Sequence, residues 1–189
     1  VTPGAFQSTF LGGGAGWSGE QDGVVVKLNQ DLSNIEWATY LGSSTGSDMC
    51  YGLRIDQYDN VYVCGAAGGA DFPTTGDGVA PVYIGGEHDA FIAYLSSDGS
   101  TLLNSTFWGT TQKDVAFFID IDNVDDVAIY GQSEGTMPIE PASIYSQGGS
   151  KQFLASFEPD LSAMKYSTVV GGNFLVPVAF MVDNCGYIY

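Results

Sequence analysis

The sequence predicts an all-β fold built from repeated units of four short antiparallel strands. One segment occurs three times, at residues 22–28, 89–95 and 151–157, and similar β-rich segments and turns follow each copy. No stretch of the chain predicts a helix. Regular repetition indicates that one supersecondary unit is arrayed and that a single unit is not a complete domain.

The first strand of each unit is apolar on both faces. In residues 22–28, Val24, Val26 and Leu28 alternate on one face, while Val25 on the other face is also apolar. Strands that are apolar on both faces are typical of sheets that lie between other layers. We therefore expect these strands to be covered on both sides.

Three further strands are expected in each unit, and β-branched and aromatic residues dominate them. Polar and glycine-containing turns separate them. The second strands are expected at 35–41, 103–108 and 164–170, the third at 51–56, 116–121 and 178–183, and the fourth at 61–65, 127–131 and 187–189.

Four short strands in meander order, followed by a longer connector, are the arrangement of a β-propeller blade. Tandem sandwiches would need about seven strands per unit. The predicted fold is therefore an incomplete ring of four-stranded antiparallel blades, with about two full blades and a partial third.

The repeats also suggest boundaries along the chain. Residues 1–21 are expected to be the end of a preceding repeat and its connector, 22–88 and 89–150 two blade repeats, and 151–189 a partial third. The chain starts without Met and stops within an expected strand, so we expect a fragment of a larger array. A closed ring needs about four blades, so residues 1–189 alone are expected to expose sheet edges and to be poorly stable or to associate.

The chain is strongly acidic, with 22 Asp and Glu against 5 Lys and Arg and a net charge of −17. Such a charge repels phosphate backbones and anionic membranes, which argues against nucleic-acid binding. The 44% hydrophobic content argues against a disordered acidic tail. The acidity either keeps the protein soluble or serves cation binding at the surface. No apolar run reaches transmembrane length, and no signal peptide is recognisable.

The three cysteines, Cys50, Cys64 and Cys185, are odd in number and lack metal-type spacing. Two interpretations remain open. They are buried free thiols in strands, or Cys50 and Cys64 form a disulfide in an oxidising compartment.

Several segments together resemble the SBBP, or bacterial β-propeller, repeat: Thr-Tyr-Leu-Gly at 39–42, Asp-Asn-Val-Tyr-Val at 59–63, Asp-Phe-Pro-Thr-Thr at 71–75 and Asp-Ala-Phe-Ile-Ala-Tyr-Leu at 89–95. The element at 182–189 is similar to a variant in large surface proteins of gliding Bacteroidetes. The resemblance implies an exported, cell-surface array of blades, with type IX secretion as the route and gliding motility as the context. It implies no catalytic motif.

The sequence offers little for catalysis. His88 is the only histidine, so no site that needs two can form, and its polar loop predicts a solvated residue. Paired carboxylates can cleave glycosidic bonds, and Asp120, Asp122, Asp125 and Asp126 are candidates. Equivalent turns in other units are also acidic, which favours turn chemistry over a unique active site.

Two binding hypotheses remain. Asp120, Asp122 and Asp125 place oxygen ligands at alternating positions that suit calcium, although the run lacks the central Gly and distal Glu of an EF-hand loop. Trp17, in a glycine-rich loop, is the candidate aromatic for stacking on a ligand, whereas Trp37 and Trp108 are expected to pack between blades. No other cofactor is expected.

These observations lead to one function and two alternatives. We expect a non-enzymatic, secreted or cell-surface propeller that acts as a scaffold for adhesion or partner binding. Its partner would be a protein or a glycan at the cell surface, and the secretion machinery is a further expected partner. The alternatives are a propeller hydrolase or lyase that acts on polysaccharide, and a structural spacer that carries another functional domain.

Overall fold

The computed structural model describes residues 1–13, 20–172 and 177–189. These residues form ten β-strands and no helix, as the sequence predicts. The described part of the chain contains no helix that could span a membrane. The strands are β1 (Gly23–Leu28), β2 (Ile35–Leu41), β3 (Met49–Ile55), β4 (Val61–Ala67), β5 (Asp89–Leu95), β6 (Leu102–Trp108), β7 (Asp114–Ile121), β8 (Val127–Ser133), β9 (Gln152–Phe157) and β10 (Met164–Val170).

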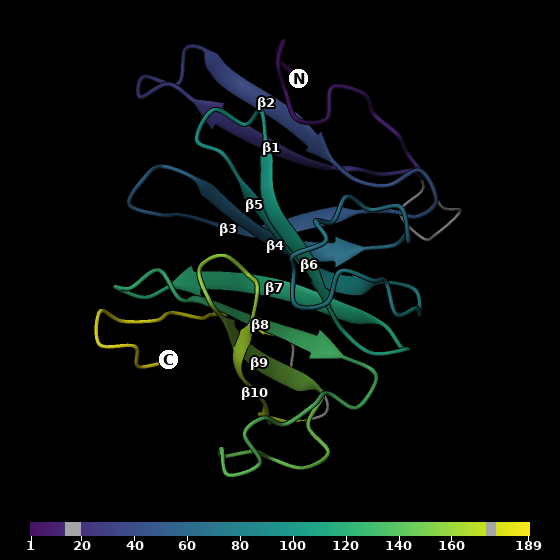
Figure 1. Cartoon of the computed structure of the whole chain (residues 1–189), viewed down its shortest axis with the longest axis vertical. Helices are drawn as coiled ribbons and strands as arrows, with labels where there is room; N and C mark the ends of the chain where they lie inside the picture. The colour runs from purple at the N-terminus through teal and green to yellow at the C-terminus, as the bar shows by residue number, and fades with distance from the viewer. Residues whose placement is uncertain (14–19, 173–176) are drawn as a thin grey trace.

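The strands form three antiparallel sheets that follow one another along the long axis of the molecule (Figure 1). Sheet A consists of β1 and β2, sheet B has the order β3-β4-β5-β6, and sheet C has the order β7-β8-β9-β10. Sheets B and C are four-stranded meanders, which are the blades of a β-propeller. The ring is open, because sheets A and C lie at opposite ends of the molecule, and sheet A has two strands among the described residues (Figure 1).

Each four-stranded sheet takes two strands from one sequence repeat and two from the next. In sheet B, β4 pairs with β5, so that Gly65 lies opposite Phe91. In sheet C, β8 pairs with β9, so that Gly131 lies opposite Phe153. The boundaries at residues 22, 89 and 151 are therefore boundaries of sequence repetition, and the sheets are offset from them by two strands.

The expected strands at 178–183 and 187–189 are not formed as strands. A single antiparallel bridge joins Val182 to Ile188, and Met181 and Tyr189 exchange backbone hydrogen bonds of 3.2 and 3.0 Å. Among the described residues, no further strand pairs with this C-terminal hairpin, in contrast to the β3–β4 hairpin, which pairs with β5.

Two hydrophobic cores hold the sheets together. The first lies between sheets A and B and includes Val25, Trp37 and Phe91. The second lies between sheets B and C and includes Trp108, Ile129 and Phe153. Face-to-face packing of sheets therefore accounts for strands that are apolar on both sides.

The aromatic and cysteine residues bear out part of the sequence analysis. Trp37 and Trp108 are buried between sheets, as expected, at 7% and 9% exposure. All three cysteines are free: Cys64 is buried in β4, Cys50 is half-buried in β3, and Cys185 is exposed in the C-terminal hairpin. The interpretation as free thiols therefore holds, with Cys185 on the surface rather than in a strand.

Candidate functional site

The first class of hairpin turn connects β3 to β4 and β7 to β8, and an aspartate caps it. The Asp56 carboxylate accepts hydrogen bonds from the backbone N–H groups of Tyr58 at 2.8 Å and Asn60 at 2.9 Å. The Asp122 carboxylate accepts from the N–H groups two and four residues later in the same way, at 2.9 and 3.0 Å. Asp183 repeats the pattern in the C-terminal hairpin. These carboxylates hold the turns by the local bonds that Asp is suited to make.

A second class of turn connects β1 to β2, β5 to β6 and β9 to β10. Its aspartate accepts hydrogen bonds from the backbone N–H and the hydroxyl of the serine two residues later. The three pairs are Asp31–Ser33, Asp98–Ser100 and Asp160–Ser162. These hydrogen bonds lower the pKa of all three carboxyls, that of Asp98 to about 2.

A pocket of about 160 Å³ lies where turns of sheets B and C meet. One wall comes from sheet B and the other from the two turns of sheet C. Gln57 of sheet B donates a hydrogen bond of 2.8 Å to Asp125 of sheet C, which ties the walls together. The residues that line the pocket are Asp56, Tyr58, Tyr62, Tyr94, Asp125, Pro159 and Asp160.

Two tyrosines form the sheet B wall of this pocket. The rings of Tyr62 and Tyr94 stack at 4.2 Å between centroids, with 9° between their planes. The Tyr62 hydroxyl donates to the carbonyl of Pro159 at 2.7 Å, and the Tyr94 hydroxyl donates to Asp56 at 2.6 Å. Burial raises the pKa of Tyr62, and burial followed by the bond to Asp56 raises that of Tyr94 to about 12. Both hydroxyls therefore keep their protons near neutral pH and act as donors.

Three carboxylates line the pocket, and none of its lining residues is Lys or Arg. Burial disfavours the charged form of Asp56, but hydrogen bonds from Tyr94, Asn60 and Tyr58 outweigh it and lower the pKa. The pocket therefore carries negative charge at neutral pH. Such a pocket suits a ligand with cationic or hydrogen-bond-donating groups.

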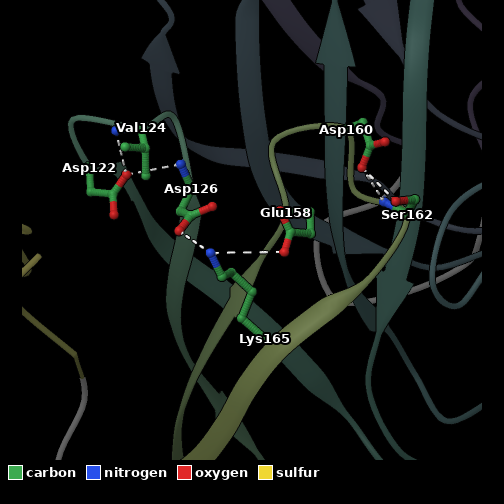
Figure 2. A network of polar contacts seen from close by, with 7 residues as sticks. All are labelled: Asp122, Val124, Asp126, Glu158, Asp160, Ser162 and Lys165. Atoms are coloured by element: carbon green, nitrogen blue, oxygen red, sulfur yellow. Dashed lines mark hydrogen bonds and ion pairs between the residues drawn. The ribbon is translucent and has the colours of Figure 1, made fainter.

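Lys165, which does not line the pocket, is held by two acids of sheet C. Figure 2 shows Lys165 of β10 between Asp126 and Glu158, with the Glu158 carboxylate at 3.9 Å. The bond to Asp126 raises the pKa of Lys165. In the same view Asp122 caps its own turn and Asp160 binds Ser162. Lys165 is thus engaged on sheet C and does not neutralise the pocket.

The three aspartates of the calcium hypothesis have different partners. Asp120 forms an ion pair with Arg54 at 2.7 Å and accepts from the backbone N–H of Val182 at 2.8 Å. Asp122 caps its turn, and Asp125 accepts from Gln57. Within residues 1–13, 20–172 and 177–189, no three His, Cys, Asp or Glu side chains form a group that could hold a metal ion. The geometry gives the calcium hypothesis no support.

His88 is not the solvated loop residue that its polar neighbours predict. It is 7% exposed, because the connector folds back on β7 and the Asp114 N–H donates to the His88 carbonyl at 2.8 Å. Burial lowers the pKa of His88. The adjacent Asp89 is also buried, accepts from the Ile84 N–H at 2.6 Å, and has its pKa raised by burial to about 6. These groups lie at the opposite end of sheet B from the tyrosine pocket.

Two outcomes concern the expected binding residues. Trp17 lies outside the described residues. The sequence analysis missed the tyrosine pocket, although Asp125 was among its candidates. The recurring acidic turns indicate that candidate residues gather at one end of the sheets. The sequence does not show that Tyr62 lies beside Tyr94, because this depends on the register between β4 and β5.

Comparison with known proteins agrees with the architecture. Residues 36–73 match the SBBP family, described as a beta-propeller repeat. The matched segment runs from β2 of sheet A, through β3 and β4 of sheet B, into the following connector. The segment that matches the family model therefore crosses from one sheet to the next. No curated protein matches the chain.

Proposed function

We propose that this chain is a non-enzymatic β-propeller binding scaffold that uses the tyrosine pocket between sheets B and C. The observation that carries the proposal is the lining of that pocket, with three carboxylates, an exposed tyrosine and no lysine or arginine. A cationic segment of a protein partner fits this chemistry best, since an ammonium or guanidinium group can bind a carboxylate and a tyrosine face together.

A binding role suits the polar groups of the pocket better than a catalytic one. Both Asp56 oxygens accept hydrogen bonds from its own sheet, and one oxygen of Asp160 is used by Ser162. A general acid would need a raised carboxyl pKa, whereas the pKa values of Asp56 and Asp160 are lowered. These features support recognition and offer nothing to the hydrolase or lyase alternative.

The proposed setting is the cell surface, after export by type IX secretion. The resemblance of residues 182–189 to surface proteins of gliding Bacteroidetes motivates this part of the proposal. The net charge of −17 suits a large soluble array. The partners are a cell-surface protein or glycan and, during export, the secretion machinery.

The test is a binding assay with a matched pair of variants. The probes are a panel of short lysine- and arginine-containing peptides and a glycan array. Asp125→Asn combined with Asp160→Asn should weaken the best peptide at least about tenfold, because each carboxylate offers a charge-assisted hydrogen bond. Asp31→Asn is the control, since Asp31 makes the same turn as Asp160 but does not line the pocket.

The outcomes separate the candidate functions. Peptide binding that the double variant loses and the control keeps supports the proposal. Binding to a glycan alone, with the same dependence on the pocket, would replace the protein partner with a carbohydrate. Peptide binding that is insensitive to the pocket variants, or no binding to either probe, would refute the proposed site and leave the structural spacer.

A further inference from the structure

The strand β1 has an unpaired edge and an exposed apolar face. Its only partner among the described strands is β2. Val24, Val26 and Leu28 point away from sheet B, and each is 44–48% exposed. At the equivalent positions of β5 and β9 the side chains are fully buried: Phe91, Ala93 and Leu95 in β5, and Phe153, Ala155 and Phe157 in β9. Sheet A therefore lacks the neighbour that the other two sheets have on this face.

A hollow of about 200 Å³ lies beside β1, where sheet A meets β3. Leu53 and Ile55 of β3 line it and are 51% and 55% exposed. Their counterparts in β7, Ile119 and Ile121, occupy the same places in the ladder. Ile119 is buried and Ile121 is half-buried, because β7 packs against β3 and β4. The hollow thus marks the place where a β3–β4 type hairpin would complete sheet A.

The opposite end of the molecule presents a second hollow, of about 190 Å³, on the outer face of sheet C. The C-terminal hairpin covers part of this face, and the ring of Phe180 packs on Tyr130 at 5.8 Å between centroids. Tyr130, Leu154 and Val170 remain half-buried. In the described residues, no strand pair of the β1–β2 type lies beside this hairpin.

The C-terminal hairpin has the same geometry as the hairpins that complete sheets B and C. Val182 pairs with Ile188 as Ile55 pairs with Val61 and as Ile121 pairs with Val127. Asp183 caps its turn as Asp56 and Asp122 cap theirs. In sheet B, Val61 lies opposite Leu95, whose equivalent in β1 is Leu28. The same register would place Ile188 opposite Leu28.

We propose that two copies of this chain associate head to tail, with the C-terminal hairpin of each copy completing sheet A of the other. The C-terminal hairpin of one copy fills the hollow beside β1 of the other copy. The exposed face of β1 in turn covers the outer face of sheet C. The described residues of one copy supply three sheets when the two half-sheets count as one, so two copies together make six sheets, within the usual four to eight blades. A two-fold axis relates the two copies, so the hairpin-to-β1 contact occurs twice and the ring closes.

A pair of variants with one introduced cysteine each tests this register. Leu28→Cys and Ile188→Cys are each made in a Cys185→Ser background, which removes the exposed native thiol. Under mild oxidation, a mixture of the two variants should give a disulfide-linked dimer, and neither variant alone should do so. Cross-linking of Leu28→Cys with itself would instead show edge-to-edge pairing of two β1 strands and would overturn the proposal.

The mass of the unmodified chain in solution provides a second test that needs no variant. Light scattering with size-exclusion chromatography should find a dimer. A monomer at every concentration, or an open series of larger assemblies, would contradict the closed ring.

Val26→Lys should raise the dimer dissociation constant at least about 100-fold, because it buries a charge in the contact. Val82→Lys is the control, since Val82 is 71% exposed in the connector and outside the contact. Equal effects of the two variants would refute the proposed surface. Neither test involves the tyrosine pocket. A failure of the dimer proposal can therefore be distinguished from a failure of the binding proposal.

Discussion

Tyr62 and Tyr94 stack face to face on adjacent strands, and their hydroxyls serve different sheets. Tyr62 donates to the Pro159 carbonyl of sheet C, while Tyr94 donates to Asp56 of its own sheet. The stack depends on the register between β4 and β5 within sheet B, and the Tyr62 hydroxyl adds a hydrogen bond between sheets B and C. The tyrosine pocket exists only because both relationships hold.

Replacing Tyr62 with Phe tests the contact between these sheets. The variant keeps the stacked ring and removes the hydroxyl that bonds to Pro159, so the free energy of unfolding should fall by about 1–2 kcal/mol. Urea denaturation measures the change. Tyr58→Phe is the control, because Tyr58 is 70% exposed, and its effect should stay below about 0.5 kcal/mol. Equal losses in both variants would argue against the contact.

Two glycines test the close packing of strands in sheets B and C. A Cβ at Gly65 would lie 1.8 Å from the Met49 carbonyl oxygen, and one at Gly131 would lie 2.2 Å from that of Val115. Gly65→Ala and Gly131→Ala should each lower the free energy of unfolding by about 3 kcal/mol, the upper end for overpacking. At Gly76 a Cβ would meet nothing within 4 Å. Gly76→Ala should therefore be neutral or slightly stabilising, and a large loss there would contradict the structure.

The pH dependence of stability should report the buried Asp89. Burial raises its pKa from 3.8 to about 6, so between these values the folded chain holds a proton that the unfolded chain has released. The contribution of Asp89 to the free energy of unfolding is therefore complete below pH 4 and is lost as the pH rises through 6. Asp89→Asn should stabilise the chain by about 1–3 kcal/mol at pH 7.5 and by little at pH 4.

An exposed aspartate provides the opposite control for this experiment. Hydrogen bonds from Ser96 and Ser100 lower the pKa of Asp98 to about 2, so its contribution is present above pH 4 and is lost as the pH falls. Asp98→Asn should destabilise the chain at neutral pH. If Asp89→Asn changed stability equally at pH 4 and pH 7.5, the assigned burial of Asp89 would be wrong.

Thiol labelling should distinguish the cysteines. Burial raises the pKa of Cys50 to about 12 and raises that of Cys64 as well, whereas Cys185 is exposed. The thiolate is the reactive form. Iodoacetamide should therefore label Cys185 quickly in the folded chain and the other two only after denaturation. Fast labelling of Cys64 under native conditions would contradict its burial in the core between sheets B and C.

The strands were predictable because their alternation is a local property. All ten strands agree with the expected segments to within two residues at each end. The division into sheets was not predictable in the same way. The short loop at 42–48 passes from sheet A to sheet B, whereas the long connector at 68–88 returns within sheet B. An assignment based on connector length would therefore place the boundary between sheets at 68–88, whereas it lies at 42–48.

The candidate site was only partly predictable for a related reason. Acidic turns could be recognised from the sequence, since Asp caps such turns through local hydrogen bonds. The burial of His88 and the stack of Tyr62 on Tyr94 depend on contacts between segments that are distant in the chain. The positions of such contacts follow from the register of the sheets, which the repeat pattern leaves open.

The most direct test of the account is the pairing of β4 in solution. Nuclear Overhauser effects between backbone protons should connect Gly65 with Phe91 and Gly131 with Phe153, which are opposite each other in the ladders. These contacts show that successive sequence repeats share one sheet. Contacts from β4 to β1 within the same chain, such as Val61 to Leu28, would instead show that each repeat forms its own sheet and would contradict the account.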